Sequence, residues 1–424
     1  MKQYRKVESR RHPTARIACG DPVQSKVESL ISHYCLSVWV LLTLSAAVLF
    51  TCCRHDEPVI PVEEEHIGDT LIVVPPTDSA SIRQPVIVGF YLLNEGNMGS
   101  NKSTLDYYDY TTATYRRNIY GEANPDVPKE LGDVGNDLKI YGNRLYAVIN
   151  CSNKVEVLDA RTCKRIGQVN IPNCRYITFD GKYAYVTSYA GPVSLDASHA
   201  QIGYVARFDT ATLQIDSTCL VGYQPDELAV ANGKLYVANS GGYMVPDYDS
   251  TVSVIDLKTF MQTKRITVAK NLWRVRTDAQ GQLWVSSRGD YYGTPAKLYC
   301  IDPATDQVTD SISIAVSAMD IAGDSLYACA TAWDYINYED VVTYSIINTR
   351  THKVVSTNFI TDRTETQIQK PYCVKVHPLT RDIYVSDAKN YVNPGMLHCY
   401  APNGTHKWAV QTGDIPSQIA FVTK

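Results

Sequence analysis

Residues 226–239 read DELAVANGKLYVAN, and this stretch decides the fold. Asn232-Gly233 stands between two alternating apolar runs, which is a strong hairpin signal because both central residues of such a turn need a positive φ. Two further β-type runs follow it along the chain. The segment therefore predicts one antiparallel sheet of four strands, at residues 227–230, 235–238, 251–255 and 263–268.

The second of these strands recurs along the chain. Seven short apolar-aromatic runs each lead into a loop: FYLLNEG from Phe90, LYAVIN from Leu145, AYVTSY from Ala184, LYVANS from Leu235, LWVSSR from Leu283, LYACATA from Leu326 and IYVSDA from Ile383. A period of roughly 40 to 50 residues built from four short strands is typical of a β-propeller, in which each repeat is one blade. The sequence thus predicts an all-β, seven-bladed β-propeller over residues 85–424.

The two ends of this repeat region belong together. Residues 414–422 read DIPSQIAFV, the pattern of an innermost strand without the rest of its blade, and the first repeat near Val86 lacks such a strand. We therefore expect the C-terminal strand to complete blade one and close the ring, because closure removes an exposed sheet edge.

A turn signature separates the third and fourth strands of most repeats. It is an Asp or Asn followed three residues later by Thr, beginning at Asp109, Asp159, Asp209, Asp256, Asp302 and Asn348. Such a side-chain oxygen accepts hydrogen bonds from backbone N–H groups two residues on. Because these residues recur at the same turn of six of the seven repeats, we interpret them as structural rather than catalytic.

Residues 1–84 lack the blade pattern. Basic residues precede an apolar run at 35–50, which is short for a membrane span and has the order of a secretory signal. The run leads into Cys52-Cys53 and then charged residues, which resembles a bacterial lipoprotein box. We predict a signal peptide over 1–53 with lipidation at Cys53; Cys52 and an ordinary signal peptide are the alternatives. The segment 54–84, rich in Pro, Glu, Asp and Ser, is predicted to be a flexible tether.

Several function classes are disfavoured by composition and motifs. A net charge of -4 offers no basic field for a phosphate backbone, so we expect no nucleic-acid partner. The eight cysteines of the repeat region lack metal-site spacings, although one or two disulfides are possible. Nucleophile-elbow, zinc-protease, phosphate-loop and dinucleotide motifs are all missing, so we predict neither catalytic residues nor a catalytic cofactor.

Long loops are expected on one side of the ring, the loop face, at 94–102, 188–204, 239–250, 288–296, 330–340 and 387–395. The tight hairpins share the opposite side, the turn face. Binding usually takes place on long loops held by a rigid scaffold.

The loops are rich in Tyr and Asn, and Tyr is the compositional outlier, with 30 residues against 7 Phe. Aromatic rings and amides together suit a large, neutral, amide-bearing or hydroxylated ligand. The candidate ligand-binding residues are Asn94, Tyr189, Asn239, Tyr243, Tyr248, Arg288, Tyr291, Tyr292, Trp333, Tyr335 and Tyr391. The alternative is that these rings only hold the loops together.

Four short segments connect the ring to a known group of proteins. They are NEG at 94–96, GDVGND at 132–137, NSGG at 239–242, and NFITD at 358–362 leading to Pro371-Tyr372. On these residues the ring resembles the YncE-like surface propeller lipoproteins of Bacteroidetes, and within them the branch that captures cobalamin above a TonB-dependent corrinoid transporter. Where that branch tends to show Gly after Pro-Tyr, this chain has Cys373, and Thr364-Glu365 replaces a Gly-containing turn.

The resemblance implies a non-enzymatic protein that captures a corrinoid (cobalamin) on its loop face and delivers it to the outer-membrane transporter. It would be lipid-anchored in the outer membrane, face the cell exterior, and be monomeric apart from the transporter. Two alternatives from other classes stay open. One is a surface module that binds a glycan or a protein, and the other is a propeller hydrolase or lyase with a metal or an acid/base pair at the channel mouth.

Overall fold

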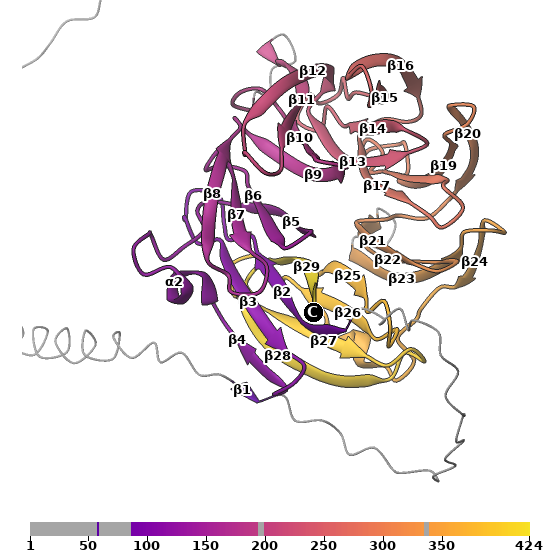
Figure 1. Cartoon of the computed structure of the whole chain (residues 1–424). Coiled ribbons are helices and arrows are strands. Elements are labelled where there is room, and N and C mark those ends of the chain that lie inside the picture. The colour runs from indigo at the N-terminus through magenta and orange to yellow at the C-terminus, as the bar shows by residue number, and fades with distance from the viewer. Residues whose placement is uncertain (1–56, 59–85, 194–198, 335–338) are drawn as a thin grey trace, which may run out of the picture. The chain divides into compact units, whose positions relative to one another are not determined.

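The computed structural model describes residues 57–58, 86–193, 199–334 and 339–424, with side chains left undescribed at 57–58, 333–334 and 339–340. The predicted signal peptide and Cys53 lie outside the described residues, as does the tether except for two residues. The described chain forms seven antiparallel sheets arranged around a common centre (Figure 1). The predicted seven-bladed β-propeller is confirmed.

Blade 1 combines the two ends of the repeat region. From inside to outside its strands are β29 (Pro416–Thr423), β2 (Ile87–Asn94), β3 (Thr104–Asp109), β4 (Thr114–Arg116) and β1 (Glu57–Pro58). The C-terminal strand is therefore the innermost strand of the first blade, as the sequence predicts. Strand β1 belongs to the segment predicted as tether, and its Glu57 pairs with Tyr115 at the outer edge.

The other six blades each follow chain order from the centre outward. Blades 2 to 4 are β5 (Gly135–Tyr141), β6 (Arg144–Ile149), β7 (Lys154–Asp159) and β8 (Arg165–Asn170); β9 (Cys174–Asp180), β10 (Tyr183–Ser188), β11 (Ile202–Asp209) and β12 (Ile215–Tyr223); and β13 (Pro225–Ala231), β14 (Lys234–Asn239), β15 (Thr251–Asp256) and β16 (Met261–Thr267). Blades 5 to 7 are β17 (Leu272–Thr277), β18 (Leu283–Ser287), β19 (Lys297–Asp302) and β20 (Gln307–Ile312); β21 (Ala318–Ala322), β22 (Ser325–Asp334), β23 (Glu339–Asn348) and β24 (Lys353–Ser356); and β25 (Pro371–Val376), β26 (Ile383–Asp387), β27 (Pro394–Tyr400) and β28 (His406–Asp414).

In the part of the chain that the structure describes, two short helical segments lie in links between blades. Helix α2 (Ile119–Ala123) connects blades 1 and 2, and the 3-10 turn η2 (Thr364–Gln367) connects blades 6 and 7. No helix among the described residues is long and apolar enough to cross a lipid bilayer.

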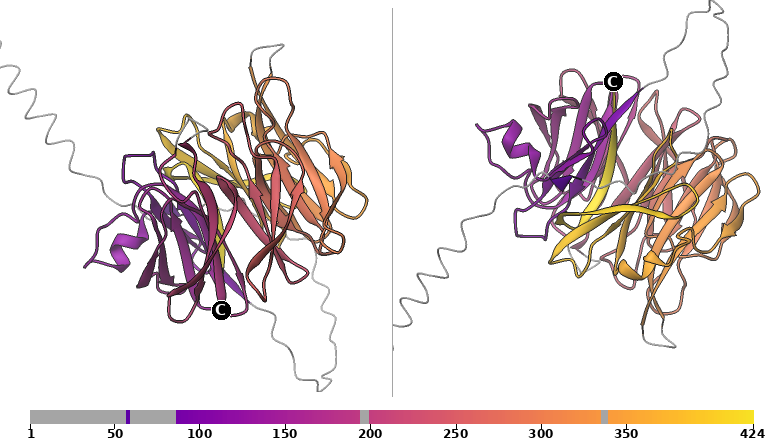
Figure 2. Two further views of the ribbon diagram at one scale, coloured as in Figure 1. Left: turned by 90° about the horizontal axis from the view of Figure 1, so that it is seen from above. Right: turned by 90° about the horizontal axis from the view of Figure 1, so that it is seen from below.

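The core lies between neighbouring blades, which Figure 2 shows edge-on. The second strand of a blade is buried on both faces, because each of its faces packs on another sheet. Its recurring aromatic residue is buried in most blades, at Tyr146, Tyr185, Tyr236, Trp284 and Tyr384. The outermost strands are the most exposed, since one of their faces meets solvent: β20 is exposed over most of its length, and every second residue of β16 is exposed.

The predicted Asp-Thr turns are confirmed. The carboxylate of Asp256 accepts the backbone N–H groups of Lys258 at 3.0 Å and Thr259 at 2.8 Å. These bonds lower the pKa of Asp256 because they favour its charged form. Asp159 and Asp209 make the same contacts, so these acids hold turns and are not arranged for catalysis.

Candidate functional site

The first residues of the inner strands gather at the loop-face mouth of the central channel. In four blades the first residue of the inner strand lies opposite the last residue of the second strand. These pairs are Cys174 and Ser188, Pro225 and Asn239, Leu272 and Ser287, and Pro371 and Asp387. The residue that follows each first position is Arg175, Asp226, Trp273 and Tyr372 respectively. In these four blades the repeat thus places one charged or aromatic side chain at an equivalent position around the channel.

A buried carboxylate is the centre of this arrangement. Asp226 is fully buried, and its Oδ1 accepts a hydrogen bond from the Tyr189 hydroxyl at 2.8 Å. Nη2 of Arg288 lies 3.1 Å from Oδ2, and Nε of Arg175 lies 3.5 Å from Oδ1. Burial raises the pKa of Tyr189 well above its usual value, so its hydroxyl keeps its proton and donates. One acid therefore orients two guanidinium groups and a phenol.

Trp273 is held by two arginines beside this cluster. The guanidinium carbons of Arg288 and Arg274 lie 4.0 and 4.2 Å from the centre of its rings, which is cation–π distance. Its Nε1 donates to the Tyr176 hydroxyl at 3.1 Å. Arg274 is itself fixed by a 2.9 Å bond from Nε to the carbonyl oxygen of Ser317. The indole is therefore a preorganised, partly exposed aromatic surface.

A second acid at the mouth is poised near neutral pH. The Tyr372 hydroxyl donates to Oε2 of Glu95 at 2.9 Å. Burial raises the pKa of Glu95 from 4.5 to about 7, although the Tyr372 hydrogen bond and the charges of Arg175 and Arg274 oppose the rise. Glu95 therefore changes charge within the physiological pH range.

This raised pKa predicts a pH-dependent stability. Between pH 4.5 and 7 the folded protein holds a proton on Glu95 that the unfolded chain releases. The stability that this proton gives is fully present below pH 4.5 and is lost as the pH rises through 7. In thermal unfolding, Tm of the wild type relative to Glu95→Gln should fall by about 2 °C or more between pH 5 and pH 8. A difference in Tm that is constant with pH would contradict the assignment.

A pocket of about 470 Å³ opens beside Trp273, between blades 5 and 6. One wall is the loop 291–296 between β18 and β19, and the other walls come from the link 315–317 and the end of β22. Arg288 and Trp273 line it from the side of the Asp226 cluster. Tyr291 and Tyr292 are 51% and 79% exposed at its rim.

The loop that carries the two tyrosines is built around Asp290. One carboxylate oxygen accepts the backbone N–H groups of Tyr292, Gly293 and Thr294 at 3.1, 2.9 and 2.7 Å. The other oxygen accepts the Thr294 hydroxyl at 2.7 Å. These bonds hold the pKa of Asp290 far below its usual range. The carboxylate therefore shapes the loop, and Tyr291 and Tyr292 are presented by a preorganised backbone.

The structure brings three predicted residues, Arg288, Tyr291 and Tyr292, together in this pocket. Tyr189 is buried in the Asp226 cluster, so it supports the mouth and presents no open surface. Tyr248 is also buried, at 9% exposure.

Asn94 and Asn239 require correction, because both are fully buried. Each stands at the end of a second strand and ties it to the third strand. Nδ2 of Asn239 donates to the hydroxyls of Thr251 and Ser253 at 3.0 Å each, and Nδ2 of Asn94 donates to Thr104 and Asp106 at 3.1 and 2.9 Å. These amides stabilise blades, and the prediction that they contact ligand was wrong.

The other predicted residues either lie apart from the pocket or have side chains that the structure does not describe. Tyr243 and Tyr391 are 44% and 41% exposed on loops of blades 4 and 7. The ring of Tyr391 lies 6.1 Å from that of Tyr372, which connects it to the channel mouth. Trp333 lies on β22, but its side chain is not described, and Tyr335 lies outside the described residues.

The sequence reasoning missed Arg175, Asp226, Trp273 and Tyr372. The predicted residues lie in or beside the long loops, whereas these four residues open the inner strands. The available signal was their common place in the repeat: each comes directly after the residue that starts an inner strand. At such a position Arg175 and Asp226 are unusual, because charged residues are rarely buried unless they are paired.

The comparisons with known proteins agree on the fold. A quinonprotein alcohol dehydrogenase-like protein from Bacteroides thetaiotaomicron VPI-5482 aligns with a TM-score of 0.55 and 15% identity, over 80% of this chain and 79% of that chain. Hydrazine synthase from Kuenenia stuttgartiensis aligns with a TM-score of 0.51 and 17% identity, over 63% of this chain and 77% of that one. At these identities the likeness shows a common propeller architecture. The curated proteins contain no match to this sequence.

In the described part of the chain, no group of three His, Cys, Asp or Glu side chains is placed to hold a metal ion. The family described as "Domain of unknown function (DUF5074)" matches residues 88–420, which include blades 2 to 7, most of blade 1 and the candidate site. The chain therefore belongs to the DUF5074 family.

Proposed function

We propose that this propeller is a non-enzymatic binding protein that captures a corrinoid such as cobalamin on its loop face. The observation that carries the proposal is the open pocket beside Trp273 and Arg288, with Tyr291 and Tyr292 exposed at its rim. Clustered exposed aromatics are typical of binding sites.

The chemistry of the pocket suits a corrinoid. Such a ligand has a broad apolar macrocycle, a fringe of amide side chains, and a nucleotide arm with hydroxyl groups and one phosphodiester. Aromatic rings pack against the macrocycle, and tyrosine hydroxyls exchange hydrogen bonds with amides. The Arg288 guanidinium at the pocket wall favours the phosphodiester charge. The cavity of about 470 Å³ accepts one part of so large a ligand, and the remainder lies across the open rim.

Preorganisation supports tight capture. The Asp290 carboxylate fixes the tyrosine loop, and the Asp226 and Trp273 contacts fix the pocket wall. A site that is ordered before binding loses less conformational entropy when the ligand arrives. Capture from a dilute environment is the role in which such a site is most useful.

Capture at the cell surface leads to delivery. We propose that a lipid on Cys53 anchors the protein in the outer membrane with the ring facing outward, and that the ligand passes to a TonB-dependent transporter. The support for this location is the apolar run at 35–50 and the residues around Cys53. Binding and delivery need no covalent bond to be made or broken. This agrees with the role of the Asp-Thr turn acids and Asp290, whose carboxylates hold turns and loops.

Titration of the purified propeller with cyanocobalamin, followed by heat and by the visible spectrum, tests the proposal. The double substitution Tyr291→Ala with Tyr292→Ala should weaken binding at least tenfold, because stacked aromatic rings contribute about 0.5–1.5 kcal/mol each beyond their buried area. Tyr141→Ala is the matched control, since Tyr141 is a partly exposed tyrosine at the turn face that stacks on Phe179. It should leave the affinity within twofold.

The outcomes separate the alternatives. If the wild-type protein gives neither heat nor a spectral shift with cyanocobalamin, a corrinoid is excluded as its ligand. Binding of oligosaccharides under the same conditions would then favour the glycan module. Equal affinities for the double variant and the wild type would place the corrinoid elsewhere on the molecule.

A further inference from the structure

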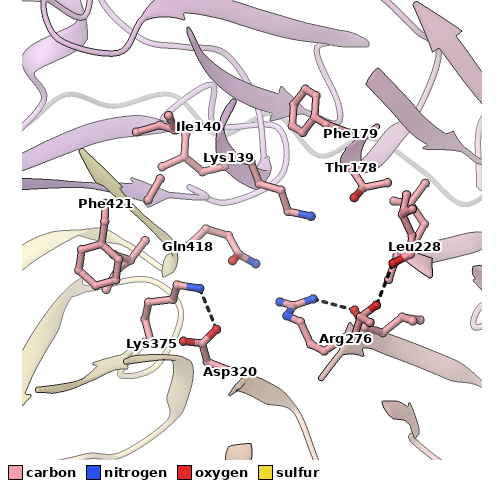
Figure 3. A pocket seen from close by; sticks show the side chains of 17 residues that line it. Lys139, Ile140, Thr178, Phe179, Leu228, Arg276, Asp320, Lys375, Gln418 and Phe421 are labelled. Carbon is pink, nitrogen blue, oxygen red and sulfur yellow. Dashed lines mark hydrogen bonds and ion pairs between the residues drawn. The ribbon is translucent and has the colours of Figure 1, made fainter. Parts of the chain in front are cut away.

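The central channel widens towards the turn face into a cavity of about 560 Å³ (Figure 3). All seven inner strands line it, from β5 through β9, β13, β17, β21 and β25 to β29. The lining residues come from the later parts of these strands, so this cavity lies at the end of the channel opposite to the candidate corrinoid site. Neither the family match nor the corrinoid proposal gives it a role.

Three cationic side chains from three separate blades line this cavity. They are Lys139 of β5, Arg276 of β17 and Lys375 of β25. In Figure 3 the nitrogen ends of all three point into the open space, together with the side-chain amide of Gln418. All three are partly exposed, between 25% and 33%.

Each cation has an acidic partner that also serves the sheet, and one of these acids, Asp320, lines the cavity as well. Asp137, Glu227 and Asp320 are buried, and each accepts a backbone N–H from the next inner strand. These bonds are Ile177 to Asp137 at 3.0 Å, Val275 to Glu227 at 2.8 Å and Val376 to Asp320 at 2.9 Å. The carboxylates therefore join neighbouring blades, and their acceptor capacity is partly used by the backbone.

The cations keep donors for a ligand. Nζ of Lys375 contacts Asp320 at 2.7 Å. Nζ of Lys139 lies 3.5 Å from Asp137 and donates to the carbonyl oxygen of Ile177. Arg276 contacts Glu227, and its Nη1 donates to the carbonyl oxygen of Val275 at 3.0 Å. An ammonium carries three N–H donors and a guanidinium five, more than the acceptors that the described residues supply here. Burial would raise the pKa of Glu227, but the charges of Arg276 and Arg274 lower it below its usual value, so this carboxylate stays ionised and holds Arg276 in place.

Arg274 separates this cavity from the loop-face site. Its Nε donates to the carbonyl oxygen of Ser317 and its Nη1 donates to the Tyr176 hydroxyl at 3.1 Å, so the side chain crosses the channel between blades 3, 5 and 6. Next to it the channel has a void of only about 20 Å³. A ligand in the turn-face cavity therefore enters from the turn face.

We propose that the turn-face cavity is a second binding site, for a small molecule that carries two or three carboxylate or phosphate groups. Because the cations lie on three separate walls, they match a molecule that carries several anionic groups better than a molecule that carries one. The volume exceeds that of a lone phosphate ion and leaves room for a short bridge between the groups. Oxyanions form their strongest hydrogen bonds with lysine and arginine, which makes this donor set selective for them.

Calorimetric titration with citrate and with inorganic pyrophosphate tests the site, and acetate serves as the monovalent comparison. The double substitution Lys375→Gln with Asp320→Asn removes one cation without changing net charge, and the amide oxygen that replaces the carboxylate keeps an acceptor for the Val376 N–H. It should weaken binding at least tenfold. The matched control is Lys407→Gln with Asp382→Asn, an ion pair at 3.3 Å outside the cavity, which should leave binding within twofold.

Each outcome decides for or against the site. Binding of citrate alone or of pyrophosphate alone supports it and identifies the anionic group. Absence of heat with both, or unchanged affinity in the Lys375 and Asp320 variant, overturns it. If that variant fails to fold, Arg276→Lys keeps the charge beside Glu227, and it should weaken binding at least threefold. Cyanocobalamin affinity should be the same with and without citrate, so failure of this site is distinct from failure of the corrinoid site.

Discussion

Replacing Asp226 with Ala should lower the free energy of unfolding by about 3–5 kcal/mol, because it leaves buried charges without their partner. Arg288 and Arg175 are both largely buried, and both lie against this carboxylate. Tyr189 loses the acceptor of its hydroxyl as well. Because Arg288 also holds the Trp273 ring, the substitution should weaken corrinoid binding together with stability.

Urea unfolding followed by circular dichroism measures this effect. Asp216→Ala is the control, since Asp216 pairs with Arg207 at 2.9 Å on the outside of blade 3, where the carboxylate is exposed. An exposed pair of this kind contributes about 0–1 kcal/mol. If the two variants differ by less than 1 kcal/mol, the buried cluster does not have the energetic role that its geometry indicates.

The sequence predicted the blades well because the information for a blade is local. Asn232-Gly233 sets a hairpin with its immediate neighbours, and Asp256 with Thr259 sets the next turn within four residues. The closing strand was also predictable, because residues 414–422 carry an inner-strand pattern that lacks a local partner. What the sequence left unseen was β1, whose pairing with Tyr115 depends on a chain segment without a blade pattern.

The candidate site was predictable only where its residues are close together in the sequence. Arg288, Tyr291 and Tyr292 belong to one loop, so their meeting in one pocket follows from their sequence spacing. Trp273 meets Tyr176 across 97 residues, and that contact arises from the curvature of the whole ring.

The error at Asn239 has a related cause. The residue is the last one of β14, at the boundary between strand and loop. At such a position, the direction of the side chain determines whether it packs into the blade or faces solvent. Composition does not contain that information, because the same amide satisfies a Thr-Ser pair in the next strand as readily as a ligand.

Ending the chain at Ile415 should open the ring and abolish the native fold. The lost segment is β29, which pairs with β2 from Asn94 opposite Pro416 to Ile87 opposite Thr423. Its Ile419 and Val422 are buried in the core, and burial of such side chains contributes about 1.5–3 kcal/mol each. Together with the loss of ladder hydrogen bonds along β2, the cost approaches the about 5–15 kcal/mol that stabilises a typical domain.

Strand replacement in trans separates loss of closure from general damage. A synthetic peptide with the sequence of residues 414–424 should restore the thermal transition of the truncated chain, because it offers β2 the same backbone partners and fills the same core positions. A scrambled peptide of the same composition is the control, since it keeps the hydrophobicity and loses the register. A truncated chain that melts cooperatively at the wild-type Tm without peptide would show that blade 1 is stable without its inner strand, and that closure by the C-terminus does not hold this ring together.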